Sequence, residues 1–414
     1  MRRYDVIVIG AGPAGLLAAG RAAEKGASVL LLEKMRQEGR KLLITGKGRC
    51  NITNSAEVGD FLKHVHPHGR FLKSAFIQFY NDDIIDLLNR YGVETVLERG
   101  GRYFPSTGRS GDVLDALLKW VHEEGVEIRC GVRVEKILVR DGRIEGVRTG
   151  SGNLLASRVV LATGGRSYPA TGSDGDGYRM AREVGHTVVK TRPALVPLVT
   201  AGKVPAGLHN LILKNVNVVL WLDGKKAAEE FGEMAFTDFG LSGPVILTLS
   251  KRVVDALEEG REVKVAIDLK PALDEKKLDR RLLRDLDENG KKELGTVFRK
   301  WLPASMVPVF IELLEIDPKK MCHQVASSER KRIRYLLKNL AFSIHKYRSF
   351  KEAVITAGGI PTTEINSGTM ESKVLSGLYF AGEIIDLDAD TGGYNLQIAY
   401  STGWLAGETS YTNL

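Results

Sequence analysis

The stretch from Tyr4 to Lys34 constrains the fold more than any other part of the chain. A short apolar run at 6–9 is followed at once by Gly10, Gly12 and Gly15 in a G-x-G-x-x-G arrangement. An Ala- and Leu-rich segment at 16–25 and a second apolar run at 27–32 complete a strand, turn, helix and strand. This order is typical of a dinucleotide-binding unit, in which the glycines allow a tight turn, close approach of a pyrophosphate and close helix–strand packing.

The same unit predicts where a dinucleotide would lie. Pro13 and Ala14 open the helix, whose N-terminus would hold the pyrophosphate on its unpaired N–H groups. Glu33, followed by Lys34, ends the second strand 18 residues after Gly15, where a carboxylate accepts hydrogen bonds from ribose hydroxyls. A carboxylate would repel a 2′-phosphate, so the site favours FAD or NAD over NADP.

Composition limits the class of protein. With 414 residues, 43% of them hydrophobic, the chain can form two or three domains with large cores. No apolar run approaches the roughly 18 residues of a membrane span, and the N-terminal strand leaves no room for a leader peptide, so a cytoplasmic protein is expected. The net charge of +8 favours an anionic partner such as RNA, or only promotes solubility.

Cysteine and histidine usage argues against metal and disulfide chemistry. The three cysteines are widely spaced without a C-x-x-C pair: Cys50, Cys130 and Cys322. This excludes a disulfide framework, a Cys-rich zinc site and a disulfide reductase with vicinal cysteines. Three histidines alternate as they would on one face of a strand: His64, His66 and His68. No matching carboxylate or Cys cluster accompanies them, so no metal site is predicted.

Residues 36–54 place glycines between basic side chains and so offer N–H groups and cations to an anion. The run from Arg40 to Leu43 followed by TGKGRCN resembles the signature of a family of bacterial flavoproteins, described as aminoacetone oxidase-like or as uncharacterised NAD(P)/FAD-dependent oxidoreductases. In that family this segment wraps the FAD pyrophosphate and ribityl chain. The resemblance therefore assigns a set of residues to the cofactor: Arg40, Lys41, Thr45, Gly46, Gly48, Arg49, Cys50 and Asn51. Cys50 is interpreted as a small buried residue there, not as a redox thiol.

Three further segments extend the resemblance to both ends of the chain. The buried strand at 159–161 runs into Ala162-Thr163-Gly164, which in two-dinucleotide-fold flavoproteins contacts the adenosine half of FAD, as does the backbone at Val134. The C-terminal stretch GEIIDLDADTGGYNLQ implies a second group of cofactor residues: Gly382, Glu383, Asp386, Gly392, Gly393, Asn395, Leu396 and Gln397. Glu383 is expected on the ribityl chain, with Asp386 as the alternative. A helix at 399–407 would point its N-terminus at the flavin pyrimidine.

The order of these segments predicts a discontinuous architecture. We expect an α/β fold with a Rossmann-like, glutathione-reductase-like FAD domain built from 1–190 and 353–414. A β-barrel-like domain (191–270 and 339–352) and a small helical insert (271–338) would interrupt it. The helices of the insert carry many Lys and Arg residues, which form either a solvated surface or a face that docks RNA or a partner.

The reaction predicted from this site is hydride transfer at flavin N5, catalysed by an FAD-dependent oxidoreductase of unassigned substrate. Only one dinucleotide fingerprint is present, so NAD(P)H would dock transiently, or the substrate itself would reduce the flavin. The alternatives are an oxidase of a small amine such as aminoacetone, a reductase of a small enone or of uracil in ribosomal RNA, and a non-catalytic flavin- or RNA-binding module. Three loop hydroxyls are candidate catalytic groups: Tyr103, Tyr168 and Tyr394. The substrate and the oligomeric state stay open.

Overall fold

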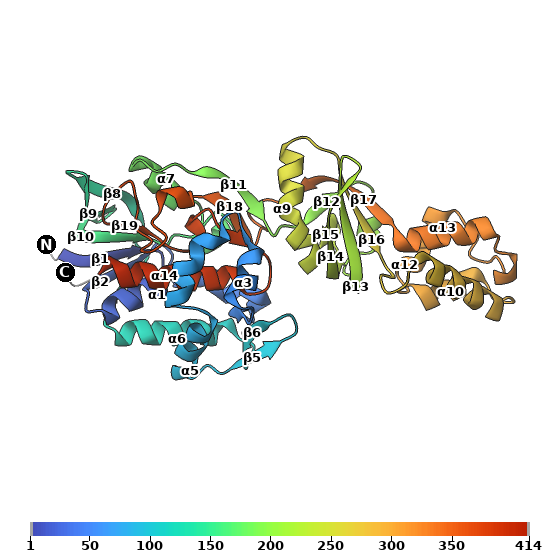
Figure 1. The fold of residues 1–414 in the computed structure, drawn as a ribbon, viewed down its shortest axis with the longest axis horizontal. Coiled ribbons are helices and arrows are strands. Elements are labelled where there is room, and N and C mark those ends of the chain that lie inside the picture. Colours follow the sequence, from blue (N-terminus) through green and yellow to red (C-terminus); the bar gives the residue numbers. More distant parts are fainter. Residues whose placement is uncertain (1–2, 412–414) are drawn as a thin grey trace. The chain divides into compact units, whose positions relative to one another are not determined.

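A computed structural model of the protein describes residues 3–411. The chain forms two compact units (Figure 1). The first combines the chain up to Ala194 with the chain from Phe350 onward, and the second is Leu195–Ser349. Each unit has a hydrophobic core of its own. Within residues 3–411, no helix combines the length and the apolar character that crossing a bilayer requires.

The first unit is built on a mixed sheet with the order β7-β2-β1-β10-β9-β8, in which β19 also pairs with β10. The strands that form its parallel part are β1 (Arg3–Ile9), β2 (Val29–Glu33), β7 (Glu127–Cys130), β10 (Gly152–Leu161) and β19 (Leu378–Phe380). β8 (Val134–Arg140) and β9 (Arg143–Thr149) join β10 as an antiparallel meander. Val8 lies between Leu31 and Val160, and all three are completely buried, as expected for a parallel sheet covered on both faces.

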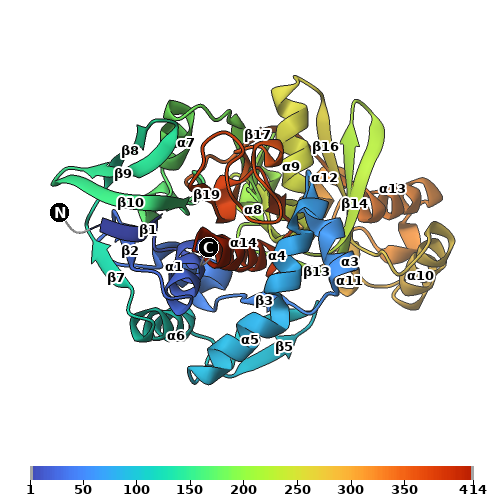
Figure 2. The same cartoon turned by 60° about the vertical axis from the view of Figure 1, so that its left-hand side comes forward.

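Two helices that are far apart in sequence pack on each other beside this sheet (Figure 2): α1 (Pro13–Glu24) and α14 (Tyr394–Ser410). A Cβ atom on Gly403 would lie 2.3 Å from the Ala14 carbonyl oxygen, and one on Gly407 would lie 2.4 Å from that of Ala18. Backbone therefore contacts backbone at both glycines. Because the partner residue advances from 14 to 18 as α14 advances from 403 to 407, the two helices run parallel.

The predicted start of the C-terminal helix, at 399, was wrong. α14 begins at Tyr394, directly after Gly393, whose φ is +97°. In the sequence, Asn395 and Gln397 look like loop residues. In the fold their side chains hold the first turn of the helix in place: Asn395 bonds to the backbone of Ala389, and Gln397 bonds to the hydroxyl of Thr53. The first turn of α14 thus depends on tertiary contacts that local sequence does not reveal.

Short sheets and helices complete the first unit. The small sheets are β3 (Thr53–Asn54) with β6 (Arg102–Pro105) and β5 (Thr95–Glu98), β4 (Val65–His66) with β20 (Asp388–Ala389), and β11 (Val189–Ala194) with β18 (Ile355–Gly359). The other helices are α2 (Arg40–Ile44), α3 (Val58–Phe61), α4 (Lys73–Gln78), α5 (Asn81–Arg90), α6 (Ser110–Glu123) and α7 (Asp176–Glu183). Since β11 and β18 pair antiparallel, the chain leaves and re-enters this unit on neighbouring strands.

The second unit contains a closed antiparallel barrel with the order β12-β15-β14-β13-β16-β17. Its strands are β12 (Leu198–Thr200), β13 (Ile212–Leu222), β14 (Lys225–Phe236), β15 (Gly240–Ser242), β16 (Val263–Asp268) and β17 (Leu340–Tyr347). Its helices are α8 (Val204–Gly207), α9 (Pro244–Glu258), α10 (Glu275–Glu288), α11 (Leu294–Trp301), α12 (Met306–Leu314) and α13 (Ser327–Lys338). β13 is one long strand whose pairing with β14 is interrupted by bulges, and the helix α9 inside the barrel segment was not predicted. The predicted fold class, a discontinuous Rossmann-like domain with an inserted barrel, is confirmed.

Candidate cofactor site

The turn between β1 and α1 has three glycines with three different surroundings. A Cβ on Gly10 would lie 2.6 Å from the Ala162 carbonyl oxygen, and one on Gly15 would lie 1.8 Å from that of Gly10. A Cβ on Gly12 meets no described atom within 4 Å. No side chain of residues 3–411 caps α1 at Gly12, and Pro13 occupies the first turn. The helix N-terminus therefore faces open space with N–H groups that suit an anion.

Glu33 lies at the end of β2 and bends over this turn. Its carboxylate accepts hydrogen bonds from the N–H of Ala11 at 2.9 Å and from the N–H of Met35 at 2.8 Å. Val134, the first residue of β8, is buried in the adjoining part of the same sheet. The structure thus brings the predicted ribose carboxylate next to the glycine turn.

Lys34 belongs to an ionic cluster that sequence reasoning missed. Its ammonium lies 2.7 Å from carboxylate oxygens of Asp174 and Asp176, and Arg133 bonds to the same two residues. Burial raises the pKa of Asp174, but the bonds to Lys34 and Arg133 outweigh that effect and bring the pKa to about 2. The cluster joins the end of β2 to the segment before α7. Within it, the carboxylates of Asp174 and Asp176 balance the positive charge of Lys34.

The segment from Gly39 to Asn51 folds over the turn with unusual backbone geometry. Gly39, at φ +62°, donates its N–H to the Ala11 carbonyl, and α2 starts directly after it. The left-handed residues that follow are Gly46, Lys47, Gly48 and Cys50. Thr45 caps this bend by donating its hydroxyl to the Leu42 carbonyl. Arg40 is half-buried at the start of α2.

Two of the predicted cofactor residues in this segment have other contacts. Arg49 pairs with Glu98 at 2.5 Å and covers the ring of Phe104 at 4.3 Å. Cys50 is completely buried, and burial raises the pKa of its thiol to about 12. The protonated thiol is the less reactive form at neutral pH, which agrees with a packing role for Cys50.

Two buried polar atoms near the turn have no hydrogen-bond partner within residues 3–411, the Oδ1 of Asn51 and the Oγ1 of Thr163. Thr163 follows β10, where Ala162 donates its N–H to the Ile9 carbonyl and so holds this segment against Gly10. Gly164 continues the segment at φ +70°. Both atoms are inaccessible to solvent, so the surrounding protein encloses them.

Glu383 is the centre of a hydrogen-bond network. One carboxylate oxygen accepts a hydrogen bond from the Lys41 ammonium at 2.5 Å. The other accepts hydrogen bonds from the Ser167 hydroxyl and the Thr356 N–H, both at 2.8 Å. The network ties α2, the loop after β10, β18 and the C-terminal segment together. Gly382, at φ +75°, lies against Ala14 of α1. Asp386 is half-buried nearby, and its N–H bonds to the Ile360 carbonyl.

The N-terminus of α14 is held by the β3 segment. A Cβ on Gly393 would lie 2.4 Å from the Thr53 carbonyl oxygen, and the Asn54 amide donates to the Gly392 carbonyl at 2.9 Å. Gln397 is completely buried and accepts from the Thr53 hydroxyl at 2.6 Å, while Leu396 is partly buried. No described side chain caps α14.

The N-termini of α1 and α14 point the same way and are staggered. Gly403 lies opposite Ala14, so α14 starts eight residues earlier than α1 along their common direction. At 1.5 Å per residue this is an offset of about 12 Å. Both helix N-termini are uncapped and suit negative charge, and this offset along the helix direction sets one apart from the other.

The three candidate tyrosines lie in different surroundings. Tyr394 is buried at the start of α14 and stacks on His64, with 4.6 Å between ring centroids. Tyr103 lies on β6, opposite Thr53 of β3. Tyr168 has a left-handed backbone, and burial raises the pKa of its phenol. Tyr394 is thus the first residue of α14, and Tyr103 lies beside β3. Tyr168 directly follows Ser167, whose hydroxyl bonds to Glu383.

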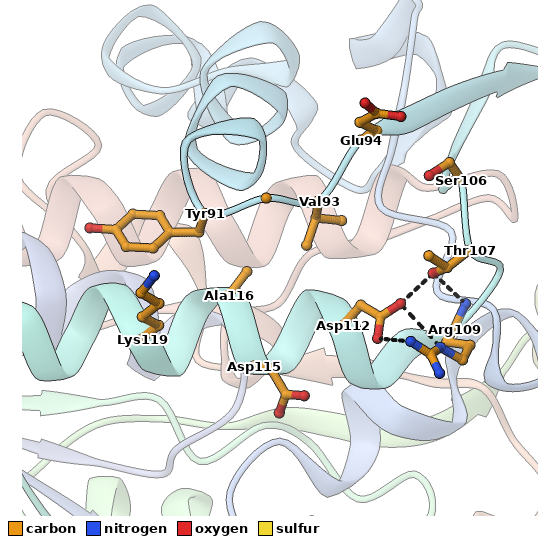
Figure 3. A pocket seen from close by; sticks show the side chains of 11 residues that line it. Tyr91, Val93, Glu94, Ser106, Thr107, Arg109, Asp112, Asp115, Ala116 and Lys119 are labelled. Carbon is orange, nitrogen blue, oxygen red and sulfur yellow. Dashed lines mark hydrogen bonds and ion pairs between the residues drawn. The ribbon is translucent and has the colours of Figure 1, made fainter.

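A separate polar hollow lies between the α5–β5 turn and α6 (Figure 3). There the Asp112 carboxylate on α6 accepts hydrogen bonds from the side chains of Thr107 and Arg109, so these polar groups bond to one another. The hollow shares no residue with the predicted cofactor site. Across residues 3–411, no group of three or more His, Cys, Asp or Glu side chains is arranged to hold a metal ion.

The residues around the turn fit FAD. The space at Gly12 and the uncapped N-terminus of α1 suit a pyrophosphate, and Glu33, next to the same turn, suits a ribose. The second uncapped helix end, at Gly393, suits the electron-rich edge of a flavin ring. This fold and this site define an FAD-dependent oxidoreductase.

Residues 4–409 match the HI0933-like protein Rossmann domain. The chain is 32% identical to 3-dehydro-bile acid delta(4,6)-reductase of Clostridium scindens, over 97% of its own length and 98% of the relative. It is 31% identical to ribosomal RNA dihydrouridine synthase of Escherichia coli, over 98% and 97%. A 3-ketosteroid delta1-dehydrogenase from Sterolibacterium denitrificans shares the fold, with a TM-score of 0.50 and 13% identity over 98% of this chain and 99% of that one. The chain belongs to the HI0933-like family.

Two residues that build the Glu383 network were not predicted as site residues from the sequence. Ser167 and Thr356 lie in ordinary loop and strand contexts, and each bonds to Glu383 from far away along the chain. The histidine motif gave a partial signal. The carboxylate that seemed missing for His64 and His66 is Asp390, which the pairing of β4 with β20 brings to them.

Proposed function

We propose that this protein is an FAD-dependent reductase that saturates a C=C bond conjugated with a carbonyl group. Two relatives that match it over nearly their whole length are a delta(4,6)-reductase of a 3-dehydro bile acid and a dihydrouridine synthase. An enone in a steroid and the uracil ring share this conjugated arrangement. NAD(P)H is the proposed electron donor, docking transiently, because one dinucleotide fingerprint is present and FAD uses it.

The stagger of the two helix N-termini carries the proposal. Bound FAD would supply hydride at N5. The chain's own groups hold the cofactor in the proposed site: the N–H groups at Gly12 bind the pyrophosphate, and Glu33 accepts from the ribose. Lys41 pairs with Glu383, which follows Gly382 at the N-terminal turn of α1, and the ribityl chain would run beside this pair.

Anaerobic stopped-flow absorbance tests this function. We expect NADH or NADPH to bleach the oxidised flavin, and a 4-en-3-one steroid or a uracil-containing RNA fragment to restore it, while the matching saturated ketone does not. Reduction by aminoacetone together with no reduction by either nicotinamide would instead support the amine oxidase. If no donor reduces the flavin, the protein is a non-catalytic binding module and the proposal fails.

A specific observation favours RNA as the carrier of the acceptor. Residues 271–338 contain 16 basic and 11 acidic residues and so hold +5 of the net charge of +8. Internal pairs such as Arg330 with Asp279 and Lys320 with Glu329 neutralise part of this charge. Lys331 and Tyr335 lie one turn apart on α13, and Tyr335 is 67% exposed. An exposed aromatic ring beside a cation is suited to stacking on an unpaired base.

We expect Tyr335→Ala and Lys331→Ala to weaken binding of a ribosomal RNA fragment, with the lysine variant also lowering the salt slope by about one. Lys226→Ala, on the β14 strand of the barrel, is the control because Lys226 already pairs with Glu229. Fluorescence anisotropy at several salt concentrations measures both effects. Equal affinities for all four proteins would remove α13 as an RNA surface and leave a small enone as the substrate.

A further inference from the structure

A histidine–aspartate pair lies directly before α14. The Nδ1 of His64 is 2.8 Å from one carboxylate oxygen of Asp390, and the Nε2 of His66 is 4.0 Å from the other. The short ladder between β4 and β20 brings these residues together, and Asp390 donates its N–H to the His64 carbonyl at 3.1 Å. The pair is therefore held by backbone pairing as well as by its side chains.

The imidazole of His64 is fixed in orientation. Its ring stacks on Tyr394 with 22° between the ring planes, and the Phe61 ring packs edge-on against Tyr394, with 4.7 Å between the centroids. The Asn395 amide donates to the backbone carbonyls of Ala389 and Asp390, which fixes the backbone that carries the Asp390 side chain. With Nδ1 engaged by Asp390, the opposite edge of the ring carries Nε2, and the His64 side chain is 43% exposed.

These features do not describe a metal site or a buried structural contact. Among the described residues, His64, His66 and Asp390 are not part of any group suited to hold a metal ion. The pair lies at the same end of α14 that receives the reacting part of the cofactor in the proposed site.

We propose that His64 is the general acid of the reduction and that Asp390 positions it. The proposal rests on the proposed function. Hydride adds to the carbon β to the carbonyl, the C=C π bond breaks, and its electron pair moves toward the carbonyl as an enolate. The Nε2–H bond of the His64 imidazolium then breaks, and the proton forms the new C–H bond at the α carbon. The neutral imidazole regains a proton from water through its exposed edge, and NAD(P)H is the two-electron reductant.

The test uses the FAD-loaded full-length protein with the substitution His64→Gln. Both half-reactions are followed by stopped flow. We expect flavin content and reduction by NAD(P)H to be unchanged and reoxidation by the conjugated acceptor to slow by about 10²- to 10⁴-fold, the usual contribution of a general acid. His68→Gln is the control, because His68 is exposed in the same segment. Asp390→Asn should shift the pH profile of reoxidation without abolishing it.

A second readout does not depend on turnover. Nitrogen-15 NMR of histidine-labelled protein, with the His64 signal assigned by the His64→Gln variant, reports which ring nitrogens are protonated. We expect Nδ1 to carry the proton that bonds to Asp390 and Nε2 to be the nitrogen that gains and loses a proton. The charged and titratable groups around the ring are Asp390, His66, Tyr394, Asp60 and Lys63, so Asp390→Asn should move this titration more than Asp60→Asn does.

The outcomes separate the two proposals. If the wild-type protein reduces no conjugated acceptor, the proposed function fails, and the NMR titration still decides whether His64 can exchange a proton. If the wild type reduces the acceptor and His64→Gln does so within twofold of its rate, His64 is not the acid. An imidazole that stays neutral from about pH 5.5 to 8.5 would overturn the proposal in either case.

Discussion

At the scale of single residues, the glycines of the first turn have different surroundings, so substitutions at them should have different effects. Gly15 is surrounded by backbone, whereas Gly12 has φ −83° and open space beside it. A larger side chain at 12 is therefore compatible with the fold but fills the space proposed for the pyrophosphate.

We expect Gly12→Val to fold with an unchanged apo melting temperature and to be purified without flavin. Absorbance at the flavin band, relative to protein, measures retention. Gly59→Val is the control, because no described atom lies near its Cβ position and it is remote in sequence from the turn. A yellow Gly12→Val protein with normal flavin content would refute the pyrophosphate assignment.

The buried His186 makes stability depend on pH. Its side chain is inaccessible to solvent, with Nδ1 2.7 Å from Glu364 and Nε2 2.8 Å from the Ser372 hydroxyl. Burial lowers the pKa of His186 and outweighs the opposite effect of Glu364. Because the unfolded chain then binds the proton more tightly, the free energy of unfolding is fully retained above about pH 6.5 and falls as the pH drops below it.

Urea unfolding between about pH 5 and 7.5 measures this effect. The wild type should lose stability toward the acidic end more steeply than His186→Gln, which has no titrating group at this position. Parallel pH dependences of the two proteins would show that His186 does not titrate differently on unfolding.

At the scale of elements, α1 and α14 make the contact on which the proposed site depends. Backbone contact at Gly403 sets both the distance between the helices and the offset of their N-termini. On helix propensity alone, Gly→Ala in a helix stabilises by up to about 1 kcal/mol. Here the new methyl group would collide with the Ala14 carbonyl.

We therefore expect Gly403→Ala to destabilise the protein by about 1–3 kcal/mol, the usual cost of overpacking. Gly111→Ala in α6, where no described atom lies within 4 Å of the Cβ position, should be neutral or stabilising. Chemical denaturation of both variants gives the comparison. A stabilised Gly403→Ala protein would mean that the helices are not in backbone contact.

At the scale of the whole molecule, the second unit is an insertion with its own core. Pairing of Ala194 with Ile355 places the chain's exit and return on adjacent strands, so a short turn can replace residues 195–349. The predicted cofactor residues all belong to the first unit.

We expect the first unit, with residues 195–349 replaced by a turn of about four residues, to unfold cooperatively and to keep bound FAD. Differential scanning calorimetry and flavin absorbance test this expectation. Loss of both cooperative unfolding and flavin would show that the insertion is needed to fold the FAD-binding unit.

The sequence alone determined the elements whose physics is local. The apolar runs and the glycine turn specify a strand, a helix start and a second strand that ends at Glu33, because turn geometry and side-chain periodicity act over a few residues. The tertiary structure decided the contacts between distant segments. It brought Ser167 and Thr356 to Glu383, placed Asp390 against His64, and drew α14 onto α1 through Gly403 and Gly407. Such contacts arise from strand pairing and close helix packing over hundreds of residues, and no local pattern encodes them.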